Sequence, residues 1–166
     1  MRDAAVKSMN SIIRTLSADK ICNVIFPSLE ANFTDSSYIS KISLSHTISE
    51  IAPVVGKEYF TERVMPILYQ LLNDRCSEVR LAVASNLSKL ASTIGDQLLS
   101  PSLLNILRTL SMDRKQRVRM AIFEFIGDIS MKLGLRAFEA SLESIFFQYV
   151  TNTAASVRCT GIKKSG

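Results

Sequence analysis

The sequence has no tryptophan, one histidine, six glycines and four prolines in 166 residues. So little glycine and proline argues against a low-complexity or β-rich chain, and the dominant Leu, Ile, Ser and Ala suit a helical array. The three cysteines, Cys22, Cys76 and Cys159, form no CxxC or Cys/His ligand spacing. The pattern therefore predicts neither a disulfide framework nor a zinc site, and it indicates a reducing compartment.

Long apolar runs are also missing. No stretch reaches 18 continuous apolar residues, and no apolar segment follows the N-terminal Met-Arg-Asp. We therefore expect no membrane span and no secretory leader. The expected location is the cytoplasm, with the nucleus as a second location.

The residue types that carry catalysis are sparse. His46 is the only histidine, and we find no nucleophile–base pair, glycine-rich phosphate loop or carboxylate dyad in a common register. The sequence predicts a protein that is not an enzyme and has no cofactor or metal. The net charge of +5 permits an acidic partner. Nucleic acid is not favoured, because the basic residues form no broad stripe and no aromatic is interleaved for base stacking.

A repeat of constant length is the most informative feature present. Shifted by 39 residues, the sequence matches itself at a glycine, at a Val-Arg pair, at an Asp and at a basic position. A fixed period of this size indicates a solenoid of stacked units. The matching glycines are Gly56, Gly95 and Gly134; the acidic series is Asp35, Asp74 and Asp113, with Asn152 fourth; the basic series is Arg2, Lys41, Arg80, Arg119 and Arg158.

Each unit contains two apolar stripes with helical spacing. In the unit 57–95 the first stripe runs from Phe60 to Leu71, and the second runs through Val79, Val83, Leu87, Leu90 and Ile94. The glycine after the second stripe is suited to end a helix. The register divides the single domain 1–166 into a partial repeat 1–17, repeats 18–56, 57–95 and 96–134, and a partial repeat 135–166. A chain that starts and stops inside repeats is typical of a segment of a longer array.

Two further expectations concern particular positions. Pro27 and Pro66 fall inside the first helix of their units and should bend it. The recurrent turn Asp should accept hydrogen bonds from the amides that open the second helix. We also expect the acidic and basic series to form a ladder of ion pairs along the stack. The alternative is a set of independent, solvated side chains.

Two antiparallel helices per 39 residues, with Pro in the first helix, Asp in the turn and Val-Arg opening the second helix, is the HEAT pattern. The predicted fold class is therefore an all-α superhelix of helix pairs. Such arrays present an extended surface to another macromolecule.

Several segments are more specific than general HEAT repeats. They are Leu16-Ser17-Ala18-Asp19, Cys76-Ser77-Glu78-Val79-Arg80-Leu81, Ile94-Gly95 with Gln97 to Leu104, and Arg117-Val118-Arg119-Met120-Ala121-Ile122-Phe123-Glu124. These segments resemble the scaffold (A, or PR65) subunit family of protein phosphatase 2A, and the register resembles its later repeats.

The resemblance implies a non-catalytic scaffold of a serine/threonine phosphatase complex. In that family the later repeats hold the catalytic subunit, and earlier repeats of a longer array hold a regulatory B-type subunit. A turn with Lys-Trp-Arg contacts the catalytic subunit, and here it reads Lys115-Gln116-Arg117, preceded by Arg114. Lys115 and Arg117 match this motif, whereas Gln116 stands at the Trp position. From the residues alone, this basic turn is either a binding ridge or a solvated turn. The alternative functions are another HEAT-repeat adaptor, in transport or chromatin, and a nucleic-acid-binding helical repeat.

Overall fold

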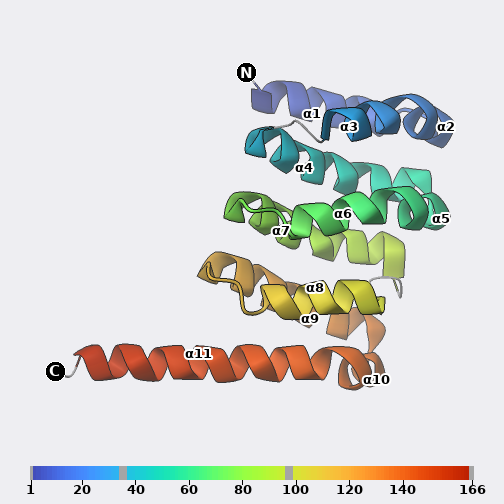
Figure 1. The fold of residues 1–166 in the computed structure, drawn as a ribbon. Helices are drawn as coiled ribbons and strands as arrows, with labels where there is room; N and C mark the ends of the chain where they lie inside the picture. Colours follow the sequence, from blue (N-terminus) through green and yellow to red (C-terminus); the bar gives the residue numbers. More distant parts are fainter. Residues whose placement is uncertain (1, 34–36, 96–98, 165–166) are drawn as a thin grey trace. The chain divides into compact units, whose positions relative to one another are not determined.

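The computed structural model describes residues 2–33, 37–95 and 99–164, without the side chains of residues 2, 3, 5, 6, 9, 10, 32 and 155–164. The described residues are helical or in turns, with no strand among them (Figure 1). The fold is an all-α HEAT-repeat solenoid, as the periodicity predicts. No helix in the described ranges is long and apolar enough to cross a membrane.

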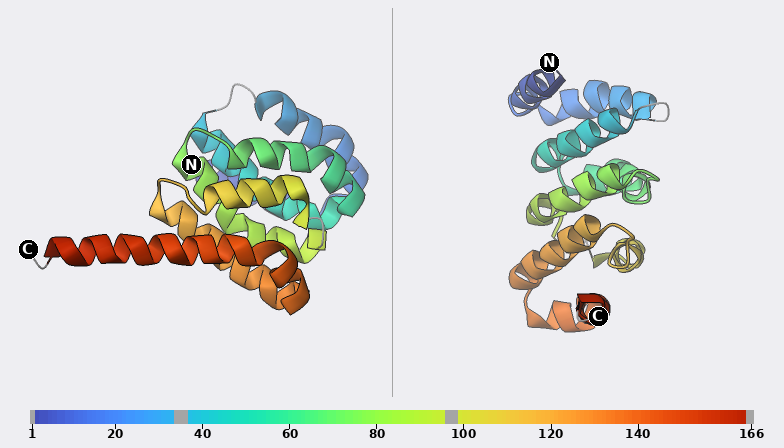
Figure 2. Two further views of the ribbon diagram at one scale, coloured as in Figure 1. Left: turned by 60° about the horizontal axis from the view of Figure 1, so that its bottom comes forward. Right: turned by 90° about the vertical axis from the view of Figure 1, so that its left-hand side faces the viewer.

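The chain divides into two compact units, Met1–Leu98 and Leu99–Gly166. In the first unit, the second helices of successive repeats are α1 (Arg2–Ile13), α4 (Tyr38–Val55) and α7 (Ser77–Ile94). Helix α4 packs against both α1 and α7 (Figure 2). The first helices are built from consecutive pieces, which are α2 (Ala18–Lys20), η1 (Ile21–Ile25) and α3 (Phe26–Phe33), then α5 (Lys57–Tyr59), η2 (Phe60–Val64) and α6 (Met65–Leu72).

The second unit begins with α8 (Pro101–Leu110) and α9 (Gln116–Leu133). The Ser100 side chain caps α8 by accepting a hydrogen bond from the Leu103 N–H, and Pro101 occupies the first turn, where its missing N–H costs nothing. The last rod is made of α10 (Leu135–Ala137), η4 (Phe138–Leu142) and α11 (Glu143–Lys164).

The apolar stripes form the core, as predicted. Val79, Val83, Leu87, Leu90 and Ile94 of α7 are each at most 1% exposed, and Val118, Ile122, Ile126 and Ile129 of α9 are buried to the same degree. Gly56, Gly95 and Gly134 follow the second helices with φ of 84°, 57° and 85°. Only glycine adopts such positive φ values without strain, which explains why it recurs where each second helix ends.

One stripe position differs from the prediction. Ile12 of α1 has the register of Ile51 and Leu90, which are 0% and 1% exposed, yet Ile12 is 57% exposed. The stripe predicts which face of a helix is apolar, but burial requires a neighbour on that face. In the described part of the chain, α1 has α4 on one side only.

The two prolines do not lie within a regular α-helix. Each follows a five-residue π-helical turn, η1 or η2, in which the helix is already widened. The Phe26 N–H bonds to the Ile21 carbonyl, so Pro27, which lacks an N–H, leaves the Cys22 carbonyl to another donor. The Tyr59 hydroxyl of the next repeat donates to that carbonyl at 3.1 Å. Segment η4 forms in the same register without a proline, so a π turn at this position does not require one.

The last partial repeat also differs. The spacing places a turn at Asn152, but α11 runs without a break from Glu143 to Lys164 (Figure 2, left). In the other units, the carboxylate of Asp74 or Asp113 holds the turn and the second helix carries a complete apolar stripe. Here Asn152 replaces the Asp and Gly161 interrupts the stripe, so little stabilises a folded-back helix.

Candidate protein-interaction surface

The turn between α8 and α9 is organised around Asp113. Its Oδ1 accepts a hydrogen bond from the Lys115 N–H at 2.9 Å, and its carbonyl accepts one from the Arg119 guanidinium. The Asp113 N–H donates back to the Leu110 carbonyl at 3.0 Å. These bonds define the backbone of the turn and leave the next four side chains directed outward. As predicted, the turn Asp accepts a hydrogen bond from an amide at the start of the second helix. That amide belongs to Lys115, the residue immediately before α9.

Arg114, Lys115, Gln116 and Arg117 are all exposed. None of the four has a side-chain hydrogen bond or ion pair within the described residues. Lys115 is the N-cap residue of α9, and Gln116 and Arg117 form its first turn, which contains no acidic residue. The partial positive charge of a helix N-terminus disfavours cations there. This cluster therefore lies where helix stability alone would place acidic side chains.

In the equivalent turn of the preceding repeat, the second helix starts with an acidic residue, as the partial positive charge of a helix N-terminus favours. Helix α7 has Glu78 in its first turn, at the position of Arg117 in α9. Cys76 and Ser77 stand where α9 has Lys115 and Gln116. The cationic cluster is thus a property of one repeat, and the general HEAT turn does not require it.

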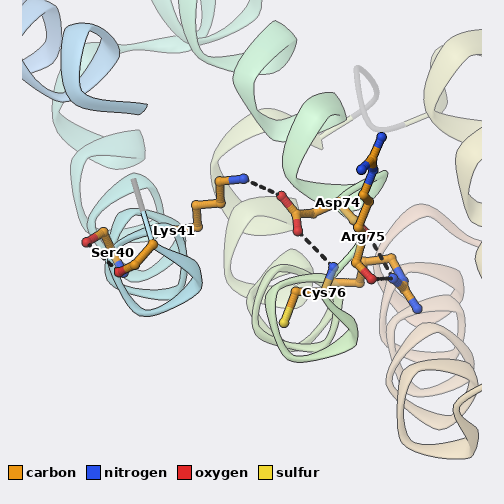
Figure 3. Close-up of polar contacts among 7 residues, drawn as sticks. Ser40, Lys41, Asp74, Arg75 and Cys76 are labelled. Atoms are coloured by element: carbon orange, nitrogen blue, oxygen red, sulfur yellow. Dashed lines mark hydrogen bonds and ion pairs between the residues drawn. The ribbon is translucent and has the colours of Figure 1, made fainter. Parts of the chain in front are cut away.

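The turn around Asp74 shows how the recurrent charges are used (Figure 3). The Lys41 ammonium, from α4, reaches the Asp74 carboxylate in the turn before α7 at 2.7 Å. The other carboxylate oxygen accepts from the Cys76 N–H at 2.9 Å. Burial alone would raise the pKa of Asp74, but the Lys41 and Cys76 hydrogen bonds and the charges of Lys41 and Arg80 outweigh it, so the pKa lies below 3.8.

Among the contacts of the described residues, Lys41 and Asp74 form a pair of the predicted ladder and join successive repeats. Arg80 donates to the carbonyls of Asp74 and Arg75, and Arg119 does the same to the Asp113 carbonyl. These arginines therefore hold their own turns, a role that the sequence periodicity did not reveal. Asp35 lies outside the described residues, as do Gln97 and Leu98, and no side chain is described for Arg158.

Beside this turn lies a polar hollow of about 360 Å³. Arg75 and Gln70 on its rim are exposed. It offers a partner polar and cationic contacts on the turn side of the repeat. The residues that line it are Phe33, Lys41, Gln70, Asn73, Asp74 and Arg75.

No arrangement typical of catalysis accompanies these turns. Within the described residues, no group of three or more His, Cys, Asp or Glu could hold a metal ion. His46 is exposed on α4, and its Nδ1 lies 3.3 Å from the buried Asn86 amide of α7. This contact joins two packed helices.

Comparison with known families agrees with this geometry. Residues 57–134 match the family described as PPP2R1A-like HEAT repeat. These residues are similar to PPP2R1A-like HEAT repeats. The match covers the repeats 57–95 and 96–134, hence both turns described above, and it confirms the resemblance to the phosphatase scaffold family. No curated protein matches the chain.

Proposed function

We propose that this PPP2R1A-like HEAT-repeat chain is a non-catalytic scaffold of a protein phosphatase 2A-type complex. It binds the phosphatase catalytic subunit through the turn between α8 and α9. Lys115 and Arg117 are the leading contacts, with Arg114 beside them. The HEAT fold supports the coarse assignment, since the stripes are used in the core and the turns remain for partners.

The cationic helix start is the observation that carries the site. Three positive side chains crowd the N-terminus of α9 against the helix dipole, and none of the three forms an ion pair within the described residues. Violations of local rules concentrate at functional sites, because function rather than stability selects them. An acidic surface on the partner would neutralise this cluster, accelerate association and define the register of docking.

Gln116 sets the expected strength of the complex. Aromatic residues are frequent interface hot spots because they bury a large rigid surface, and glutamine has none to offer. We therefore expect weaker binding than a tryptophan at this position would give. Gln116→Trp should increase the affinity, provided the turn faces the partner.

The test is a titration of the purified catalytic subunit with the wild-type chain, with Lys115→Glu/Arg117→Glu and with Gln116→Trp. Loss of binding in the charge reversal and gain in Gln116→Trp support the proposal. The matched control is Lys57→Glu/Lys89→Glu, which makes the same change of net charge at exposed positions away from the turn. Wild-type binding should also weaken with added salt.

Two results contradict the proposal at different levels. If the wild type binds and the charge reversal leaves its affinity equal to that of the control, the site is wrong. If none of the variants binds at high protein concentration, the chain does not act as a phosphatase scaffold.

A further inference from the structure

One apolar side chain stands beside the cationic cluster of the turn between α8 and α9. Met112 directly follows Ser111, the residue that caps the C-terminus of α8, and it is 53% exposed. The exposed side chains from Arg114 to Arg117 are all polar or charged. A single exposed apolar residue is ordinary on a protein surface. The importance of Met112 comes from how the turn holds it and from what surrounds it.

The backbone on both sides of Met112 is held by hydrogen bonds. The Met112 N–H donates to the Thr109 carbonyl at 3.1 Å. The next N–H, of Asp113, donates to the Leu110 carbonyl at 3.0 Å. Ser111, directly before Met112, is 1% exposed. The Met112 side chain therefore projects into solvent from a fixed point of the turn, next to a residue that the turn buries.

The next repeat contacts this side chain without covering it. The Gln148 amide, from α11, donates to the Met112 sulfur at 2.9 Å. The first helix of the repeat that follows is thus already packed beside the turn, and Met112 remains exposed with this neighbour in place. The exposure of Met112 is therefore a property of the turn between two packed repeats.

The HEAT turn itself does not require an apolar residue at this position. One period earlier the position is Asn73, which is exposed and whose amide donates to the Tyr69 carbonyl at 3.0 Å. That bond satisfies one of the carbonyls that lack a partner at the C-terminus of a helix. Methionine has no donor, so Met112 gives up a bond that the equivalent turn makes. Local stability therefore does not explain an apolar side chain at this position.

Met112 and the neighbouring cations offer complementary contacts to one partner. Protein interfaces combine apolar anchors at the centre with a polar rim that excludes water. Methionine suits the role of anchor, because its unbranched and polarisable side chain adapts to the surface that it meets. Gln116, at the Trp position of the scaffold motif, provides no such anchor. Met112 lies four positions before Gln116 in the same turn, with Arg114 and Lys115 between them.

We propose that Met112 is the apolar anchor of this turn, and that the phosphatase catalytic subunit packs an apolar side chain against it while acidic side chains contact the adjacent Arg114, Lys115 and Arg117. The inference rests on the proposed function, because it adds one contact to the same turn. The charges accelerate association, and the buried apolar area of the anchor slows dissociation. Salt screens the first contribution and leaves the second largely unchanged, so the two can be separated by experiment.

The test is a titration of the purified catalytic subunit with Met112→Asn and Met112→Leu at several salt concentrations. Asparagine is the residue that the equivalent turn contains, so the turn accommodates it. Met112→Asn should weaken binding roughly tenfold, as the loss of an anchor does, and should leave the salt dependence unchanged because the cations remain. Met112→Leu retains an apolar side chain of similar volume and should bind within about threefold of the wild type. Lys115→Glu/Arg117→Glu should lose both affinity and salt dependence.

Met131→Asn is the matched control, because it makes the same change at a methionine that is 90% exposed near the C-terminus of α9, away from the turn. It should bind like the wild type. If the charge reversal abolishes binding but Met112→Asn binds like this control, Met112 is not an anchor and the proposed function stands without it. Equal losses in Met112→Leu and Met112→Asn overturn the inference as well, because the apolar character of the side chain is then not what binds. If the wild type does not bind, the inference fails together with the proposed function.

Discussion

The Lys41–Asp74 pair should contribute measurably to stability, unlike an ordinary surface ion pair. The two side chains are 24% and 13% exposed, and the ammonium lies 2.7 Å from the carboxylate. A hydrogen bond to a charged group contributes about 1.5–3 kcal/mol, and partial exposure reduces this value through solvent screening. We expect a coupling free energy of about 1 kcal/mol between the two residues.

Asp74 has a second role that separates its variants. Its other oxygen accepts from the Cys76 N–H at the start of α7, a cap worth about 1 kcal/mol. Asp74→Ala should therefore cost about 2 kcal/mol in the free energy of unfolding, as the sum of the pair and the cap. Asp74→Asn retains an oxygen for Cys76 and should cost about half as much. Lys41→Met should cost about 1 kcal/mol, since only the pair is lost.

The assay is urea unfolding followed by circular dichroism, with a double-mutant cycle over Lys41→Met and Asp74→Asn. Arg14 and Glu50 provide the matched control, because they also join successive repeats, at 2.6 Å, but Arg14 is 69% exposed. That cycle should give less than about 0.5 kcal/mol. Equal coupling in the two cycles would refute the reasoning that burial distinguishes them.

Three further predictions concern the fold. Leu90→Ala should lower the free energy of unfolding in urea melts by roughly 2–5 kcal/mol, because Leu90 is buried. Lys89→Ala, at the exposed neighbouring position, should change it by less than about 0.5 kcal/mol. Similar costs for the two variants would contradict the stripe assignment. The lowered pKa of Asp74 means that its charged form stabilises the fold above the unfolded-state pKa, near 3.8, and that this stability is lost as pH falls through the folded-state pKa. Asp74→Asn should flatten acid unfolding in this range, and an unchanged profile would argue against it. Gly134→Ala should destabilise by about 1 kcal/mol because its φ is 85°, while Gly127→Ala, in a helix with open space at its Cβ, should be neutral or stabilising.

The repeat could be predicted from the sequence because it depends on local chemistry. The 39-residue spacing of glycine, Asp and Val-Arg, with two apolar stripes per unit, defines the helix pair, its turn and its end. Each of these signals acts within a few residues of the chain. The exposure of Lys115 and Arg117 follows from the same logic, since turn residues outside the stripes have nothing to pack against.

Tertiary structure decided which repeated residues meet. Lys41 and Asp74 lie 33 positions apart and pair because α4 packs against α7. Arg80, in the same periodic series as Lys41, also donates to carbonyls of its own turn, a contact that the spacing alone does not predict. The π-helical turns were also invisible to the apolar pattern, which reports the period of a helix but not its hydrogen-bond register.

The ends of the described array show the same limit. Ile12 has the apolar stripe of a core residue but is exposed, and α11 remains straight where the spacing predicts a turn at Asn152. A stripe determines which face of a helix can be buried. Whether that face is buried depends on a neighbouring helix, and in a solenoid each repeat receives most of its core from the repeats beside it. The sequence by itself therefore determined the helix pair that forms each repeat. Only the packing of one repeat on the next decided which surfaces of a repeat became core and which stayed exposed.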